Sequence, residues 1–125
     1  MRTYKPKAPV SRSNVPESES RLVFEVMREL GKYGCVYRCN SGTIKLPGGK
    51  VFRGMPAGFS DIMLIKPDGT CCFIETKIGK NKTTEQQDAF IEKMRRFNCL
   101  AGVARSVADA LRICGIEPED AAWID

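Results

Sequence analysis

The stretch from Gly58 to Gln87 constrains the fold of this chain more than any other, because a tight turn at its centre separates two strand-like runs. Residues 66–70 (KPDGT) lie between two segments rich in apolar and β-branched residues, a pattern that predicts a β-hairpin. Pro67 and Asp68 suit the central positions of a type I turn, and Gly69 can adopt the left-handed conformation that follows. We therefore expect a three-residue loop.

In that register Asp61 falls opposite Glu75, and Lys77 lies on the same face of the hairpin. Adjacent carboxylates repel unless a proton or a cation neutralises them. Mg²⁺ is a hard cation that takes oxygen ligands, so it fits this cluster, and a structural ion pair between Lys77 and one acid fits it as well. A four-residue loop would put the two acids on opposite faces, so the cluster depends on the predicted turn.

The amino-acid composition limits the possible chemistry. The chain has 125 residues, enough for one domain with a single core. Its six cysteines form no C-x-x-C pair and it has no histidine, which disfavours a zinc site and excludes a histidine general base. Any catalysis must use carboxylate, lysine, thiol, hydroxyl or metal-bound water. The formal net charge of +5 favours an anionic partner.

The ends of the chain differ in composition from its middle. Residues 1–17 are basic and contain three prolines, and residues 116–125 are acidic, so we expect a flexible N-terminal arm, a domain over residues 18–115 and a C-terminal tail. No apolar run approaches the roughly 20 residues of a membrane span, and the N-terminus lacks the apolar core of a secretory signal. We expect no membrane partner and a cytoplasmic location, which for a viral protein is the host cytoplasm.

Hydrophobic periodicity and capping residues predict the elements around the central hairpin. In chain order they are a helix from an N-cap at Ser18 to about Tyr33, a strand over residues 35–40, a second hairpin over residues 41–54, the central hairpin, a helix over residues 85–97, a strand over residues 100–105 and a helix between Ser106 and Gly115. Both sides of the central hairpin are apolar. This order predicts an α/β fold with a mixed central β-sheet flanked by helices on both faces.

Two polar residues lie on predicted apolar helix faces. Glu19 lies on the axis of the apolar stripe of the first helix, and Gln87 lies on the apolar face formed by Phe90, Ile91, Met94 and Phe97. Each has a structural explanation of its own, because Glu19 suits the helix dipole and Thr84-x-x-Gln87 fits a capping box. A single site between these helices and the hairpin would account for both positions.

Basic residues gather around the second hairpin and after Lys77. They are Arg38, Lys45, Lys50, Arg53, Lys80 and Lys82. A solvated surface is the default explanation, and contact with phosphate groups is the alternative.

Asp61, thirteen further residues and then Glu75-Thr76-Lys77 resemble the D-Xn-(D/E)-X-K signature of the PD-(D/E)XK nuclease superfamily. The signature is short and degenerate, but a wider pattern over residues 18–114 resembles the small stand-alone form of the VRR-NUC (virus-type replication-repair nuclease) family. That pattern comprises Glu19, Asn40-Ser41-Gly42, Arg53-Gly54, Gly58-Phe59-Ser60-Asp61, Glu75-Thr76-Lys77, Gln87-x-x-Phe90 and Val103-Ala104-Arg105-Ser106. Two positions depart from it: Ser60 replaces the proline of the superfamily name, and Asn98 stands where a glycine is expected.

The resemblance implies a restriction-endonuclease-like core and hydrolysis of DNA phosphodiester bonds with Mg²⁺ or Mn²⁺ as cofactor, without a small-molecule cofactor. It implies that Asp61, Glu75 and the Thr76 backbone carbonyl ligate the metal and that Lys77 orients or deprotonates the attacking water. It gives Glu19 the role of holding a metal-bound water or a second ion. Gln87 would position Lys77 or the nucleophile. Ser60 joins the basic residues as a candidate DNA contact.

The stand-alone members that the chain resembles suggest an endonuclease for branched DNA, such as a Holliday junction, in replication, repair or recombination. A junction has two-fold symmetry and this chain offers one site, so we expect a C₂ homodimer. The family name suggests a viral or phage setting. Two alternatives remain, a non-catalytic DNA-binding module on the same fold and an RNA-directed nuclease.

Overall fold

The structure, a computed structural model, describes residues 18–39 and 43–117 of the chain. The predicted N-terminal arm, the Asn40-Ser41-Gly42 segment and most of the predicted acidic tail lie outside the described residues. The elements in chain order are α1 (Glu19–Leu30), β1 (Cys35–Arg38), β2 (Thr43–Lys45), a 3₁₀ turn (Pro47–Gly49), β3 (Val51–Arg53), β4 (Ile62–Ile65), β5 (Cys71–Thr76), α2 (Glu85–Arg96), β6 (Leu100–Ala104) and α3 (Val107–Ile113).

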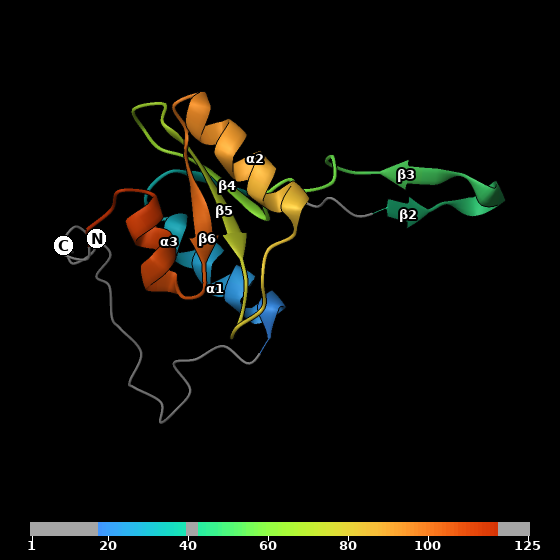
Figure 1. Cartoon of the computed structure of the whole chain (residues 1–125), viewed down its shortest axis with the longest axis horizontal. Helices are drawn as coiled ribbons and strands as arrows, with labels where there is room; N and C mark the ends of the chain where they lie inside the picture. Colours follow the sequence, from blue (N-terminus) through green and yellow to red (C-terminus); the bar gives the residue numbers. More distant parts are fainter. Residues whose placement is uncertain (1–17, 40–42, 118–125) are drawn as a thin grey trace.

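The central sheet has four strands in the order β1-β4-β5-β6. β4 is antiparallel to both β1 and β5, whereas β6 runs parallel to β5 because α2 connects the two. α1 and α3 cover one face of this sheet and α2 covers the other (Figure 1). The predicted mixed sheet with helices on both faces is therefore confirmed.

The central hairpin has the predicted register. Met63 pairs with Phe73, and the backbone N–H of Gly69 donates to the Lys66 carbonyl at 2.8 Å while its φ is +91°. Glycine adopts this left-handed conformation without the steric cost that a Cβ would bring. The three-residue loop is thus confirmed, and it keeps Asp61 and Glu75 at the same end of the hairpin.

Two apolar clusters fill the space on either side of the sheet. The cluster under α1 and α3 contains Leu22, Val26, Leu30, Ile62, Leu64, Cys72 and Ile74, all fully buried. The smaller cluster under α2 is built on Phe73, Ile91 and Ala101. Within the described ranges, none of the helices is long and apolar enough to cross a membrane.

α1 is shorter than predicted, since it ends at Leu30 instead of Tyr33. Gly31 is its C-cap, and the chain then turns toward β1. At Gly34 the chain passes so close to β4 that a Cβ would lie 2.2 Å from the Ile65 carbonyl oxygen. No side chain fits at this position, which explains the glycine between α1 and β1.

The C-terminal end of α2 also differs from the prediction. Phe97, expected on the apolar face, lies just beyond the helix and is 66% exposed. Asn98 follows with a φ of +67° and turns the chain into β6. Asparagine is among the few non-glycine residues that tolerate this conformation, which explains how it can stand where a glycine was expected.

The predicted second hairpin is confirmed as a separate two-stranded sheet of β2 and β3. It projects away from the body of the molecule (Figure 1). We call residues 43–53 the arm; this segment is distinct from the N-terminal arm predicted over residues 1–17.

Candidate active site

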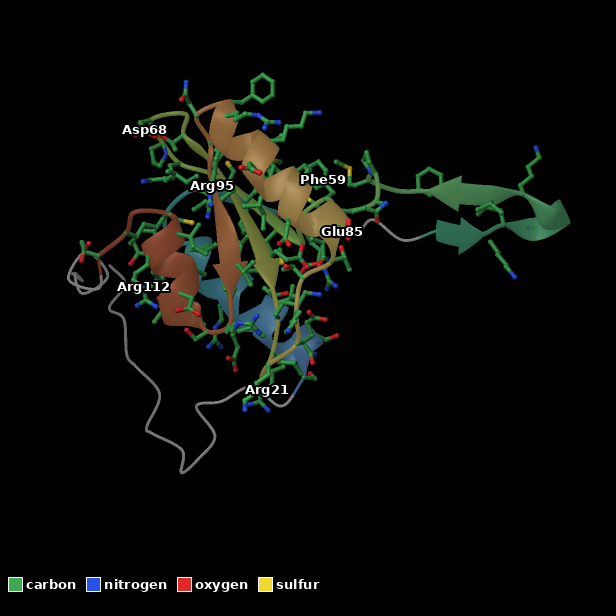
Figure 2. All side chains as sticks on the ribbon, viewed as in Figure 1. Arg21, Phe59, Asp68, Glu85, Arg95 and Arg112 are labelled. Atoms are coloured by element: carbon green, nitrogen blue, oxygen red, sulfur yellow. The ribbon has the colours of Figure 1, made fainter. Side chains whose placement is uncertain are left out.

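Asp61 follows a loop that is packed firmly against the body. The ring of Phe59 lies 4.4 Å from that of Phe90 and 5.8 Å from that of Phe73, measured between centroids. These contacts join the loop to α2 on one side and to β5 on the other. Figure 2 shows Phe59 on the same side of the molecule as Glu85, the first residue of α2. The aromatic cluster therefore fixes Asp61 relative to both elements.

Gly58 lets this loop approach the first turn of α2. Its φ is +89°, and a Cβ at this position would lie 2.6 Å from the Gln86 carbonyl oxygen. Only a residue without a side chain fits so close to another backbone. The approach brings Asp61 and Gln87 to the same end of the sheet.

Three hydrogen bonds hold Asp61. Its Oδ2 accepts from the backbone N–H of Thr76 at 3.0 Å and from the Thr76 hydroxyl at 2.6 Å. Its backbone carbonyl accepts from the N–H of Cys39 at 2.7 Å. The sequence analysis considered only the carbonyl of Thr76, and its side-chain contact was missed. A hydroxyl-bearing residue between the acid and the lysine of the E-X-K motif was the available signal.

Glu75 is almost fully buried, with 2% of its surface exposed. Its Oε2 accepts a hydrogen bond from Gln87 Nε2 at 3.0 Å. Its other oxygen, Oε1, is buried and has no hydrogen-bond partner among the described residues. A buried carboxylate oxygen without a partner is costly, so it marks a place where a proton or cation is needed.

The charge around Glu75 is unbalanced. Burial and the nearby charge of Asp61 raise the pKa of Glu75 from 4.5 to about 8, the charge of Glu19 adds to the rise, and Lys77 only partly opposes it. Glu19 lies in the first turn of α1 and is half-buried, so its charge reaches this site from a third element. The structure thus brings all five predicted side chains to one region, namely Glu19, Asp61, Glu75, Lys77 and Gln87.

Lys77 does not form a close ion pair with Glu75. Its Nζ lies 4.0 Å from Glu75 Oε2, which is beyond hydrogen-bond distance. The backbone N–H of Lys77 donates to the Ala104 carbonyl at 3.1 Å and fixes the position of the residue at the end of β5. Its ammonium group is therefore held near the acids without being bound tightly to Glu75, which counts against a purely structural ion pair.

Gln87 both caps α2 and donates a hydrogen bond to Glu75. Its Oε1 accepts from the N–H of Thr84 at 2.9 Å and its N–H donates to Thr84 Oγ1 at 3.1 Å, which forms the capping box. Its Nε2 meanwhile donates to Glu75. The partner of Gln87 is therefore Glu75, where the resemblance implied Lys77 or the nucleophile.

These two purposes of Gln87 can be separated by substitution. Thr84→Ala is expected to lower the free energy of unfolding by about 1 kcal/mol through loss of the cap, with little change in any activity of the site. Gln87→Ala is expected to lower stability by a similar amount and also to reduce activity about tenfold or more, because Glu75 loses its partner. Urea unfolding and activity assays of both variants would check this. Equal loss of activity in both variants would contradict it.

A divalent metal fits the donor set of this site. Among residues 18–39 and 43–117, no three Asp, Glu or Cys side chains form a complete metal-binding cluster. Mg²⁺ does not require one, because it is commonly bound by one or two carboxylates and keeps several waters. Asp61 and Glu75 supply two carboxylates, and the unpartnered Oε1 of Glu75 is an available ligand atom.

The predicted DNA contacts are spread over the surface, with one exception. Arg38, Lys45, Lys50, Lys80 and Lys82 are exposed, and the side chain of Arg53 lies outside the described ones. Ser60 was expected at the DNA surface, but it is fully buried and its hydroxyl has no hydrogen-bond partner among the described residues. The prediction for Ser60 is wrong because the aromatic packing of Phe59 draws this loop into the interior.

A four-stranded mixed sheet with helices on both faces, carrying paired acids and a lysine at adjacent strand ends, defines a restriction-endonuclease-like α/β fold. The chain belongs to the VRR-NUC family, since the family model of the VRR-NUC domain matches residues 35–108. A solved structure described as a VRR_NUC domain is similar, with a TM-score of 0.56 and 20% identity over 78% of this chain and 94% of that chain. A search of curated proteins found no match. The resemblance inferred from sequence is thus confirmed, and the chain carries a nuclease-type domain.

Proposed function

We propose that this protein is a metal-dependent DNA endonuclease that hydrolyses phosphodiester bonds with Mg²⁺ or Mn²⁺. The observation that carries the proposal is the buried carboxyl group of Glu75, which has an unpartnered oxygen and a strongly raised pKa beside Asp61. A cation at this point would relieve the repulsion between the two acids. Buried, strongly perturbed groups of this kind are typical of functional sites.

Asp61 and Glu75 would hold the metal, with the Thr76 backbone carbonyl as a further ligand. When bound, the metal would screen the phosphate charge and lower the pKa of a coordinated water. Thr76 fixes the Asp61 carboxylate, and Gln87 engages one oxygen of Glu75 so that the other remains available. Both ligands are therefore oriented before a metal arrives.

Lys77 would act on the substrate. Its ammonium group is held near the acids but lies beyond hydrogen-bond distance of Glu75, so it can donate to the attacking water or to the scissile phosphate. A fixed positive charge at this point stabilises the charge that develops on the phosphate in the transition state. Glu19 would hold a metal-bound water or a second ion from the side of α1.

The substrate class we propose is branched DNA, such as a Holliday junction, cut by a C₂ homodimer. Two-fold symmetric cutting requires two active sites, and each chain provides one. The formal net charge of +5 and the exposed basic residues support an anionic nucleic acid as the partner. Light scattering under assay conditions would test the dimer, and a monomer would remove the support for symmetric cutting.

The test is cleavage of a labelled four-way junction, a flap, a matched duplex and single-stranded DNA in Mg²⁺, Mn²⁺ or EDTA. We expect cleavage only with metal, and a loss of about a hundredfold or more in Asp61→Asn because a ligand charge is removed. Asp68→Asn is the matched control, because Asp68 lies fully exposed at the far end of the same hairpin. We expect its activity to stay within about twofold of wild type.

Two other results would redirect the proposal. A folded wild-type protein that binds DNA equally well in EDTA and cuts none of these substrates would indicate a non-catalytic binding module. Faster cleavage of matched RNA than of DNA in competition would indicate an RNA-directed nuclease.

A further inference from the structure

The arm lacks the packing that a hairpin usually needs. β2 and β3 form a sheet of their own, and each has the other as its main packing partner among the described elements. Two-stranded hairpins without a third strand or a packed helix are marginally stable in water. The arm is therefore a candidate for an element that is completed by a binding partner.

The arm also exposes large apolar side chains. Leu46 is 42% exposed, Val51 59% and Phe52 55%, which makes half of the six large apolar residues that are exposed in the described part of the chain. Exposed apolar groups gathered on one element commonly mark an interaction site. The question is which partner they fit.

The charge of the arm favours a nucleic acid. Residues 43–53 contain three basic residues, Lys45, Lys50 and Arg53, and no acidic one. Lys45 pairs across the hairpin with Val51, and the N–H of Leu46 donates to the Lys50 carbonyl, so lysine and apolar residues stand side by side. Lysine is depleted in the cores of protein interfaces. Basic residues next to apolar ones are instead what DNA-bending and single-strand-binding proteins use for phosphates and unstacked bases.

The arm is rooted at the candidate active site. On the β1 side, the N–H of Cys39 donates to the Asp61 carbonyl at 2.7 Å. On the β3 side, Gly58 and Phe59 hold the loop against α2 immediately before Asp61. Both ends of the segment that carries the arm therefore meet at Asp61. DNA bound by the arm would be continuous with DNA at the proposed metal site.

We propose that the arm binds DNA at unpaired or unstacked bases, with Phe52 stacking on a base and Lys50, two residues earlier in the extended chain and so on the same face, contacting a flanking phosphate. This inference rests on the proposed nuclease function for the identity of the nucleic acid. Bases in a regular duplex are stacked and present no open face to an aromatic ring. The arm accordingly gives the enzyme its preference for distorted DNA over matched duplex.

The test compares Phe52→Ala with Phe97→Ala, which removes another exposed aromatic ring at the far end of α2, off the arm. Fluorescence anisotropy in EDTA measures binding of a matched duplex and of the same duplex with a short mismatch bubble. We expect Phe52→Ala to weaken binding to the bubble about tenfold and binding to the matched duplex less than about twofold. Phe97→Ala should bind both as wild type does. Phe52→Tyr keeps an aromatic ring and should restore binding to the bubble.

Wild-type binding of the bubble by Phe52→Ala would overturn the inference. So would a change from dimer to monomer in light scattering of Phe52→Ala, because the arm would then be a contact between two copies. The binding assay needs neither metal nor cleavage, so the two proposals fail separately. If binding depends on Phe52 but no DNA is cleaved, only the proposed nuclease activity is overturned. If DNA is cleaved but binding does not depend on Phe52, only the proposed role of the arm is overturned.

Discussion

Replacement of Glu75 with glutamine is expected to abolish cleavage and to stabilise the metal-free protein at pH 9. The amide has nearly the same shape as the carboxylate, and its oxygen can still accept the hydrogen bond from Gln87. Its NH₂ group can donate toward the neighbouring Asp61 carboxylate. The substitution therefore removes a metal ligand and an unfavourable buried charge at once.

The pH dependence of this stabilisation follows from the direction of the pKa shift. The folded protein raises the pKa of Glu75 from 4.5 to about 8, so it retains a proton that the unfolded chain releases. The stability that this proton supplies is fully present below pH 4.5 and is lost as the pH rises through about 8. At pH 9 the ionised, buried Glu75 costs the metal-free wild type on the order of a few kcal/mol, and the glutamine avoids that cost.

Urea unfolding in EDTA at pH 4 and at pH 9 would measure this effect. The two proteins should have similar free energies of unfolding at pH 4, and Glu75→Gln should be the more stable at pH 9. Mg²⁺ should stabilise the wild type at pH 9 and leave Glu75→Gln unchanged, because only the wild type binds it well. Glu92→Gln, an exposed acid on α2, serves as the control. A Glu75→Gln protein that is less stable at both pH values would show that Glu75 acts as a structural ion-pair partner.

The hairpin and its site could be predicted from the sequence because short-range chemistry determines them. Pro67, Asp68 and Gly69 specify one turn, the turn specifies the register, and the register places Asp61 and Glu75 together. The N-cap at Ser18 was predicted in the same way, and its side chain does accept a hydrogen bond from the backbone N–H of Arg21, the third residue of the helix. Each of these features depends on residues within a few positions of one another.

The features that could not be predicted depend on which segments meet in space. The hydroxyl of Thr76 holds Asp61, fifteen residues away in the chain, although alternation along a strand predicts that the side chains of Thr76 and Glu75 point to opposite faces. Ser60 is buried because Phe59 packs on Phe90 of α2. The arm is likewise isolated because no other described strand pairs with it, and no local sequence pattern predicts this.

The two explanations offered for Gln87 show how local and tertiary constraints can coincide. The capping box uses only the Oε1 acceptor of its side chain at the start of α2, so the NH₂ group of the same side chain remains free to donate to Glu75. The same side chain that caps α2 is thereby positioned to contact Glu75. Competing interpretations of a motif need not exclude each other when the side chain has both a donor and an acceptor.

Substitution of Lys77 by alanine is expected to lower the cleavage rate about a thousandfold while leaving metal binding intact. Lys77 is not a candidate ligand, and its Nζ lies 4.0 Å from the nearest oxygen of Glu75. Its loss removes a positive charge from the neighbourhood of the proposed metal, which favours rather than weakens binding of a divalent cation. Asp61→Asn, in contrast, should lose cleavage and metal affinity together.

Single-turnover cleavage and calorimetric titration with Mg²⁺, both above pH 8 where Glu75 is ionised in the fold, would separate these cases. Lys80→Ala is the matched control, because Lys80 follows in the same loop and is exposed. The cleavage rate of this variant should change only a few-fold, because Lys80 contributes no more than a contact to a phosphate group. Lys77→Arg keeps the charge but changes the donor geometry, so it should recover only part of the activity. If Lys77→Ala instead loses stability and metal affinity while retaining cleavage at saturating Mg²⁺, Lys77 is a structural partner of Glu75 and the attacking water is activated by the metal alone.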